Sequence, residues 1–163
     1  MTRSGRILTI GGLLLAVWGM AYGLYYAVWV EHQTLDDIGS SLAGSFVRAA
    51  EGFRTQSQQA MQSYAAANYA YVRQVDAHGH WIGLGLLLIV LGIAFGRVAF
   101  SEKIRTALAS ALLAGAFLFP AGVLLETAMA GSLPKAVAVL GSALVIISLA
   151  GIALGFSRDR GAA

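Results

Sequence analysis

The chain has 163 residues, of which 58% are hydrophobic and only 12% are charged, against roughly 25% charged residues in a typical soluble domain. It contains no cysteine, which excludes disulfides, thiolate zinc sites, iron–sulfur clusters and haem attached through a Cys-x-x-Cys-His motif. Any metal site must therefore use histidine, carboxylate or methionine ligands. The composition is that of an integral membrane protein, and the formal net charge of +3 has to be interpreted from where the basic residues lie.

Four segments are long and apolar enough to cross a hydrocarbon core about 30 Å thick, which takes roughly 20 helical residues. They are predicted at residues 7–30, 81–100, 107–125 and 136–156, and Arg97 is the one charged residue inside them. The first apolar run exceeds the 7–15 residues of a signal-peptide core, so we expect an uncleaved anchor. The predicted fold is a single all-α membrane domain over residues 1–163, a four-transmembrane-helix bundle with a helical outer loop at residues 31–80.

The basic residues are distributed unevenly between the two sides of these spans. Seven lie on the side of both termini and four on the other side, which also holds six of the eight acids. The seven are Arg3, Arg6, Arg97, Lys103, Arg105, Arg158 and Arg160, and the four are Arg48, Arg54, Arg73 and Lys135. The positive-inside rule then predicts a bacterial inner-membrane protein with cytoplasmic termini and a periplasmic loop 31–80. The positive charge is a topology signal and does not indicate nucleic-acid binding.

The outer loop has no proline, and its apolar residues recur at steps of three and four, which predicts helix. These residues are Leu35, Ile38, Leu42, Phe46, Ala49, Phe53, Ala60, Tyr64, Tyr71 and Val75. Asp36 and Asp37 favour a helix start, and Gly52 is a candidate break. The periodicity fits one long helix that enters the second span or two helices that form a hairpin. The apolar stripe needs a partner, which can be lipid headgroups, the mouth of the bundle or another subunit.

Small residues inside the predicted spans favour close helix packing. Three glycine pairs have the small-xxx-small spacing, namely Gly19 with Gly23, Gly92 with Gly96, and Gly151 with Gly155. Pro120 is expected to interrupt the third span, since it removes one backbone hydrogen bond. The spans therefore predict a compact bundle.

Titratable residues gather where the spans reach the outer side. They are His32, His78 and His80, with the acids Glu31, Asp76 and Glu126 as a polar cluster that can carry protons. Residues two apart in a helix point about 200° apart, so His78 and His80 cannot both face one ligand unless Gly79 breaks the helix. One of the two is expected to face inward.

Three interpretations of these histidines remain open. Trp18, Tyr22, Tyr25, Trp29 and His32 follow steps of four and three along the first helix, while His78, Gly85 and Gly92 share a face with room for a flat group. The first interpretation is a b-type haem with His32 and His78 as axial ligands and Tyr25 and Trp29 packed beside it. The second is a quinone site built from the same residues, and the third is an ordinary polar and aromatic boundary of a membrane span.

The stretch "AHGHWIGLGLLLIVLGIAF" followed by "SEKIRTALASALLAGAFLFPAGVLLE" resembles small multi-span bacterial membrane proteins. In those proteins a His-x-His opens a glycine-bearing span and a proline interrupts the next, and they are themselves faintly similar to the catalytic subunit of haem–copper oxidases. The resemblance covers about a third of the chain through His78, His80 and Pro120, and it implies a respiratory membrane and haem. The chain lacks the further intramembrane histidines of an oxidase, so oxygen reduction is not implied.

Other functional classes have no support in the sequence. There is no Gly-Lys-Ser/Thr of a Walker loop, no G-x-S-x-G and no H-E-x-x-H, and the spans hold no central ionisable residue to serve as a transport relay. Two hypotheses remain: an accessory or assembly subunit of a larger, for instance respiratory, membrane complex, and a haem- or quinone-binding membrane protein. The expected partners are the lipid bilayer and other membrane subunits or further copies of the chain.

Overall fold

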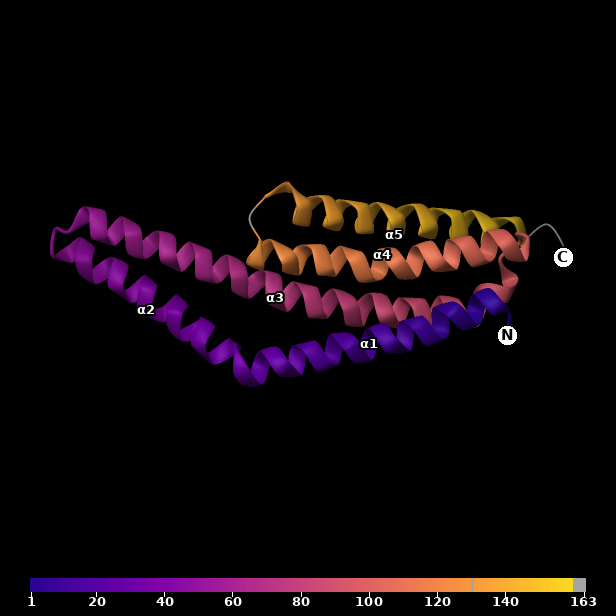
Figure 1. Cartoon of the computed structure of the whole chain (residues 1–163), viewed down its shortest axis with the longest axis horizontal. Coiled ribbons are helices and arrows are strands. Elements are labelled where there is room, and N and C mark those ends of the chain that lie inside the picture. The colour runs from indigo at the N-terminus through magenta and orange to yellow at the C-terminus, as the bar shows by residue number, and fades with distance from the viewer. Residues whose placement is uncertain (130, 160–163) are drawn as a thin grey trace. The chain divides into compact units, whose positions relative to one another are not determined.

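In the computed structural model, which describes residues 1–129 and 131–159, all regular secondary structure is helical (Figure 1). The elements are α1 (Arg3–Trp29), α2 (Glu31–Ala50), α3 (Arg54–Ala94), the 3₁₀ turn η1 (Phe95–Arg97), α4 (Glu102–Ala128) and α5 (Ser132–Asp159). The predicted all-α class is confirmed. The residues form two compact units: the bundle unit, which comprises Met1–Ala21 and the chain from Asp76 onward, and the hairpin unit, Tyr22–Val75. Arg160, counted above for topology, lies outside the described residues.

Four helices are long and apolar enough to cross a membrane: α1, α3 with η1, α4 and α5. They carry many exposed aliphatic side chains, including Leu14, Ile93 and Val139, as lipid-facing helices do. The predicted end of the second span at Phe100 is wrong. The α-helix ends at Ala94 because the chain must turn before α4 begins at Glu102, and the turn is fixed by a 3.1 Å hydrogen bond from the Ala99 N–H to the Gly155 carbonyl.

A row of glycines joins α1 to the membrane part of α3. Gly5 lies against Gly92, Gly12 against Gly85, and Gly19 against the His78 carbonyl, so both helices repeat every seven residues. A Cβ added to Gly12 would lie 2.6 Å from the Gly85 carbonyl oxygen, which shows that the two backbones touch. The room that the sequence predicted beside Gly85 and Gly92 is therefore filled by α1.

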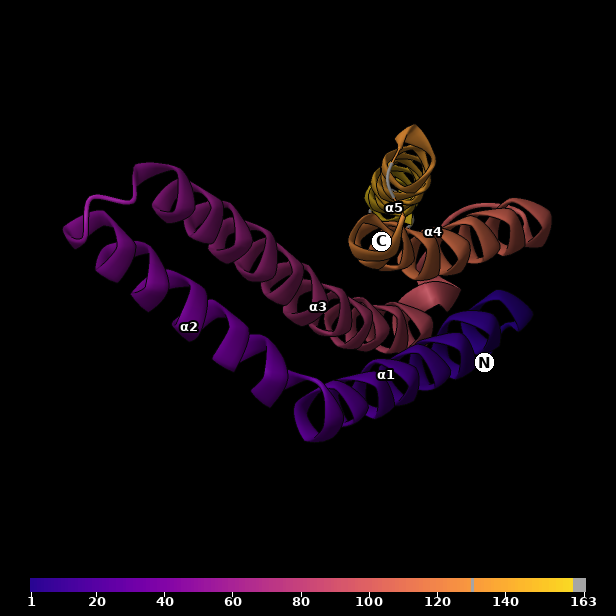
Figure 2. The same cartoon turned by 60° about the vertical axis from the view of Figure 1, so that its left-hand side comes forward.

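Helices α4 and α5 pack as an antiparallel pair, seen side by side in Figures 1 and 2. A Cβ on Gly115 would lie 2.7 Å from the Gly141 carbonyl oxygen, and Gly122 lies against Ala138 in the same way. The expected interruption at Pro120 does not occur, since α4 runs through this buried residue from Glu102 to Ala128. Its packing against neighbours holds the helix together despite the missing N–H.

In the hairpin unit α2 folds back along the first part of α3 (Figure 2). Gly52 has φ +82°, a conformation that glycine adopts at little cost, so the predicted break is confirmed. The loop is thus a hairpin, and its second helix continues into the second span. The structure combines the two predicted alternatives, a hairpin and a long helix that enters the span. The expected helix start at Asp36 and Asp37 is wrong, because α2 begins at Glu31, which supplies the acidic side chain of the first turn.

Polar contacts fix the antiparallel register of the hairpin. The Ser57 hydroxyl donates to the Ser45 carbonyl at 2.8 Å near the tip, and the Tyr71 hydroxyl donates to the Glu31 carboxylate at 3.3 Å near the other end. The seam between the helices contains small and half-buried residues such as Ala60. Larger side chains such as Ile38, Tyr64 and Tyr71 are half-buried within the hairpin as well.

Candidate functional site

Four predicted site residues belong to the hairpin unit. Tyr25 and Trp29 are exposed in the last turns of α1, with their rings stacked at 5.8 Å between centroids and 26° between planes. Glu31 is half-buried and His32 is exposed, both in the first turn of α2. The prediction that His32 extends the aromatic face of α1 is wrong, because α1 ends at Trp29 and the turn at Val30 interrupts the count of 100° per residue.

The other predicted site residues belong to the bundle unit. His78 is half-buried, whereas His80 is exposed, its Nδ1 lies 2.6 Å from the Asp76 carbonyl oxygen, and its ring meets Phe119 edge-on at 5.0 Å. Helix α3 continues through Gly79, so the two histidines point in different directions. Glu126, at the end of α4, is half-buried.

These placements bear on metal binding in two ways. Across residues 1–129 and 131–159, no three His, Asp or Glu side chains come close enough together to hold a metal ion. His32 lies in the hairpin unit and His78 in the bundle unit, so their pairing as axial haem ligands stays a prediction. A quinone site built from the same residues also stays a prediction.

An aromatic cluster inside the bundle unit was not predicted. Trp81 is 2% exposed and its indole N–H donates to the Phe117 carbonyl of α4 at 3.2 Å. Its ring stacks on Phe117 at 6.1 Å and meets Trp18 of α1 edge-on at 6.1 Å. The cluster ties α1, α3 and α4 together at one level. The sequence signal for this cluster was Trp18, because it directly precedes Gly19 in the row of glycines that lies against α3.

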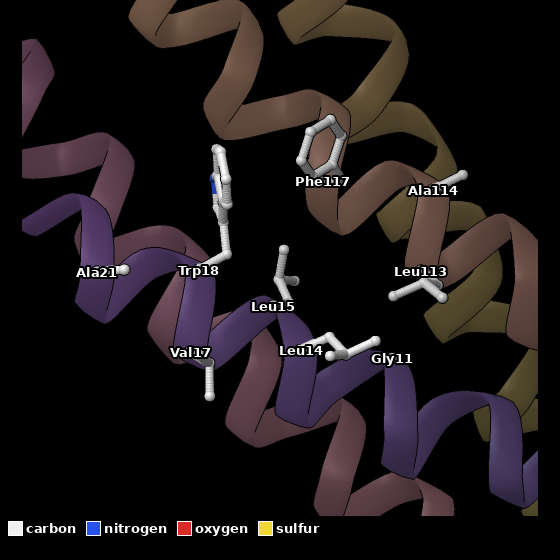
Figure 3. A pocket seen from close by; sticks show the side chains of 9 residues that line it. All are labelled: Gly11, Leu14, Leu15, Val17, Trp18, Ala21, Leu113, Ala114 and Phe117. Carbon is white, nitrogen blue, oxygen red and sulfur yellow. The ribbon is translucent and has the colours of Figure 1, made fainter.

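Two adjoining cavities lie between α1 and α4. The first, of about 600 Å³, is lined by Gly11, Leu14, Leu15, Val17, Trp18, Ala21, Leu113, Ala114 and Phe117 (Figure 3). The second, of about 690 Å³, is lined by Arg3, Arg6, Ile7, Ile10, Gly11, Leu14 and Leu113. They share Gly11, Leu14 and Leu113, and the Leu113 side chain packs on Gly11 between them. We call the two adjoining cavities together the α1–α4 groove. One end of the groove is basic, and the other is lined almost entirely by apolar surface.

The hairpin has a polar face. A cavity of about 340 Å³ there is lined by Ser40, Ser41, Gly44 and Arg48 of α2 and by Gln56, Gln59, Ala60 and Ser63 of α3. The Arg48 guanidinium donates to the Gln56 side-chain oxygen at 3.3 Å across it. Because residues of both helices line this cavity, they define one side of the hairpin.

The opposite side of the hairpin is apolar. Ser45 is buried and marks the side of α2 that faces α3. Around the axis of α2, Leu35 and Phe46 lie about 80–100° from Ser45 in one direction, and Gly44 lies about 100° from it in the other. On α3, Met61 and Val72 lie on the side opposite to Gln59 by the same count. We define the apolar face as Leu35, Leu42, Phe46, Phe53, Met61, Val72 and Val75, and Phe46 is its most open member at 65% exposed.

The predicted stripe of the outer loop therefore divides into two sets. Leu35, Phe46, Phe53 and Val75 are exposed on the apolar face. Ile38, Ala60, Tyr64 and Tyr71 are half-buried within the hairpin, Leu42 is half-buried at the edge of the apolar face, and Ala49 is exposed. Periodicity alone could not separate the sets, because both recur at steps of three and four residues.

The chain was compared with protein-family models, with curated proteins and with solved structures, and none of them matches it.

Proposed function

We propose that the protein is an integral inner-membrane accessory or assembly subunit that binds another membrane protein through the apolar face of the hairpin. The observation that carries this proposal is the contrast between the two sides of the hairpin. One side is serine, glutamine and arginine, and the other is leucine, phenylalanine, methionine and valine. A solvated hairpin has no reason to segregate its side chains in this way, whereas a docked one does.

The charge of the hairpin favours a protein partner over the membrane surface. Residues 31–75 carry four acidic and three basic side chains, a net charge of −1, so they offer no attraction to anionic headgroups. Covering the exposed parts of Phe46 and Phe53 contributes about 1–2 kcal/mol each, which makes them the expected anchors of the interface.

In the proposed topology this interface lies in the periplasm. The excess of Lys and Arg on the side of both termini supports cytoplasmic ends and an outer hairpin. The partner is then a membrane protein with an apolar surface on its periplasmic side. Four apolar helices with exposed aliphatic side chains would hold the hairpin at that level.

Site-specific photocrosslinking in intact cells tests the proposal. A photoreactive phenylalanine analogue replaces Phe46 in one variant and Gln59, on the polar face, in the matched control. We expect a protein adduct of one discrete mass from position 46 and none from position 59. Equal adducts from both positions, or adducts with lipid alone from position 46, would show that the apolar face does not bind a protein.

A charge substitution measures the same interface by a second route. Phe46→Asp with Phe53→Asp adds two charges to the apolar face, and Ser40→Asp with Gln59→Asp adds the same two to the polar face. We expect only the first pair to reduce the mass of the complex extracted in mild detergent, while both variants insert into the membrane. A complex that survives the first pair would remove this face from the proposal.

A further inference from the structure

We propose that the α1–α4 groove binds one anionic glycerophospholipid, with its phosphate on Arg3 and Arg6 and an acyl chain extending toward Trp18 and Phe117. The inference is independent of the docking function proposed for the hairpin, because every residue of the groove belongs to the bundle unit. The groove has a basic end and an apolar end, and the helices of the bundle need neither of them to pack against one another.

The basic end of the groove fits a phosphate group. Arg3 and Arg6 lie one turn apart, both are exposed, and both line the cavity. The nearby Glu102 carboxylate is already engaged, since it accepts the Ser4 N–H at 2.9 Å and pairs with Arg105 at 2.7 Å. It therefore leaves the two guanidiniums to bind an external anion, and guanidiniums match the geometry of phosphate oxygens.

The apolar end fits an acyl chain. From Arg6 to Trp18 the helix rises about 18 Å, against about 15 Å for half of a hydrocarbon core. The groove therefore descends from headgroup level to the middle of the bilayer, over the depth of a single leaflet. Figure 3 shows Leu14 and Trp18 of α1 around the opening together with Leu113 and Phe117 of α4. These side chains offer only hydrocarbon and ring surfaces to an occupant.

The size of the groove favours a lipid over a helix of another protein. The apolar cavity extends from Gly11 to Ala21, about 15 Å along α1, and a helical segment of that length and about 10 Å wide occupies roughly 1,200 Å³. The apolar cavity holds about 600 Å³ and is too small to seat such a segment, although it has room for a single extended chain. With the N-terminus in the cytoplasm, the occupant comes from the inner leaflet, where anionic lipids meet basic residues.

Native mass spectrometry of the full chain in mild detergent tests the proposal, with phosphatidylglycerol and phosphatidylcholine as probes. We expect one phosphatidylglycerol adduct and at least about tenfold weaker binding of phosphatidylcholine, since two charge-assisted contacts are at stake. Arg3→Gln with Arg6→Gln should abolish this preference. Arg48→Gln with Arg54→Gln removes the same charge from the hairpin and should retain it.

Two further measurements separate the parts of the site. Ala114→Trp projects from an exposed lining position into the apolar cavity and should weaken phosphatidylglycerol binding with both arginines intact. Inorganic phosphate at millimolar concentration should not displace the lipid if the acyl chain contributes to binding. Equal binding of the two lipids, an unchanged preference in the Arg3 and Arg6 variant, or displacement by phosphate alone would overturn the proposal.

Discussion

Substitution of Gly12 by alanine should destabilise the bundle, because Gly12 lies directly against the backbone of α3. The added Cβ would lie 2.6 Å from the Gly85 carbonyl oxygen and 2.9 Å from the Leu88 Cβ. The first distance is about 0.8 Å short of the 3.4 Å at which ordinary contact begins, so the two helices must separate or bend. Overpacking of this kind costs about 1–3 kcal/mol, and the better helix propensity of alanine offsets about 0.5–1 kcal/mol of it.

The assay is unfolding in mixed micelles with a rising fraction of denaturing detergent, followed by tryptophan fluorescence. Trp81 is buried beside the seam, so its emission should report the separation of α1 from α3. Gly83→Ala is the matched control, because nothing lies within 4 Å of the Cβ that it adds to α3. We expect a loss of about 1–2 kcal/mol for Gly12→Ala and no loss for Gly83→Ala. Equal stability of the two variants would refute the backbone contact at the seam.

Two more predictions concern topology and cofactor binding. A single cysteine at the exposed position Gln62 should react with an impermeant thiol reagent added to the periplasm, and one at Ser157 should not; the reverse pattern would invert the orientation. If His32 and His78 share a b-type haem, protein from haem-replete cells should show a Soret band that shifts on reduction and is lost on His32→Ala or His78→Ala. His80→Ala should retain the band, because His80 points away on a continuous helix, and a colourless protein without metal would exclude the haem.

The spans could be predicted because hydrophobicity over about 20 residues is a local property of the chain. The break at Gly52 was likewise local, since a positive φ is costly for any residue except glycine. The break at Val30 carried no such signal. Helical residues stand on both sides of it and neither glycine nor proline occurs there, so only the change from apolar to polar residues at Glu31, which set the predicted end of the first span, marks the position. The aromatic face that the sequence predicted from Trp18 to His32 extended two residues past the predicted end of the first span, and the structure shows that the helix is interrupted at that point.

The contacts between helices were harder to predict, because they depend on pairs of distant residues. The seven-residue spacing of Gly85 and Gly92 was recognised but interpreted as space for a flat cofactor. The complementary signal was the same spacing at Gly5, Gly12 and Gly19, which provides the opposing small surface. Two matching glycine rows on neighbouring helices indicate that the backbones fill each other's space.

Helix α1 illustrates how side-chain size divides one helix between two roles. Gly5, Gly12 and Gly19 face α3, while Gly11, Leu14 and Trp18 line the groove toward α4, and both sets recur at intervals that keep them on one side of a helix. Where the seam is glycine, another backbone fits and leaves no space. Along the groove Leu113 of α4 packs on Gly11, and the bulky side chains beside this contact leave cavities that can take a flexible chain. Periodicity therefore identifies the faces of a membrane helix, and side-chain volume indicates whether protein or lipid covers each one.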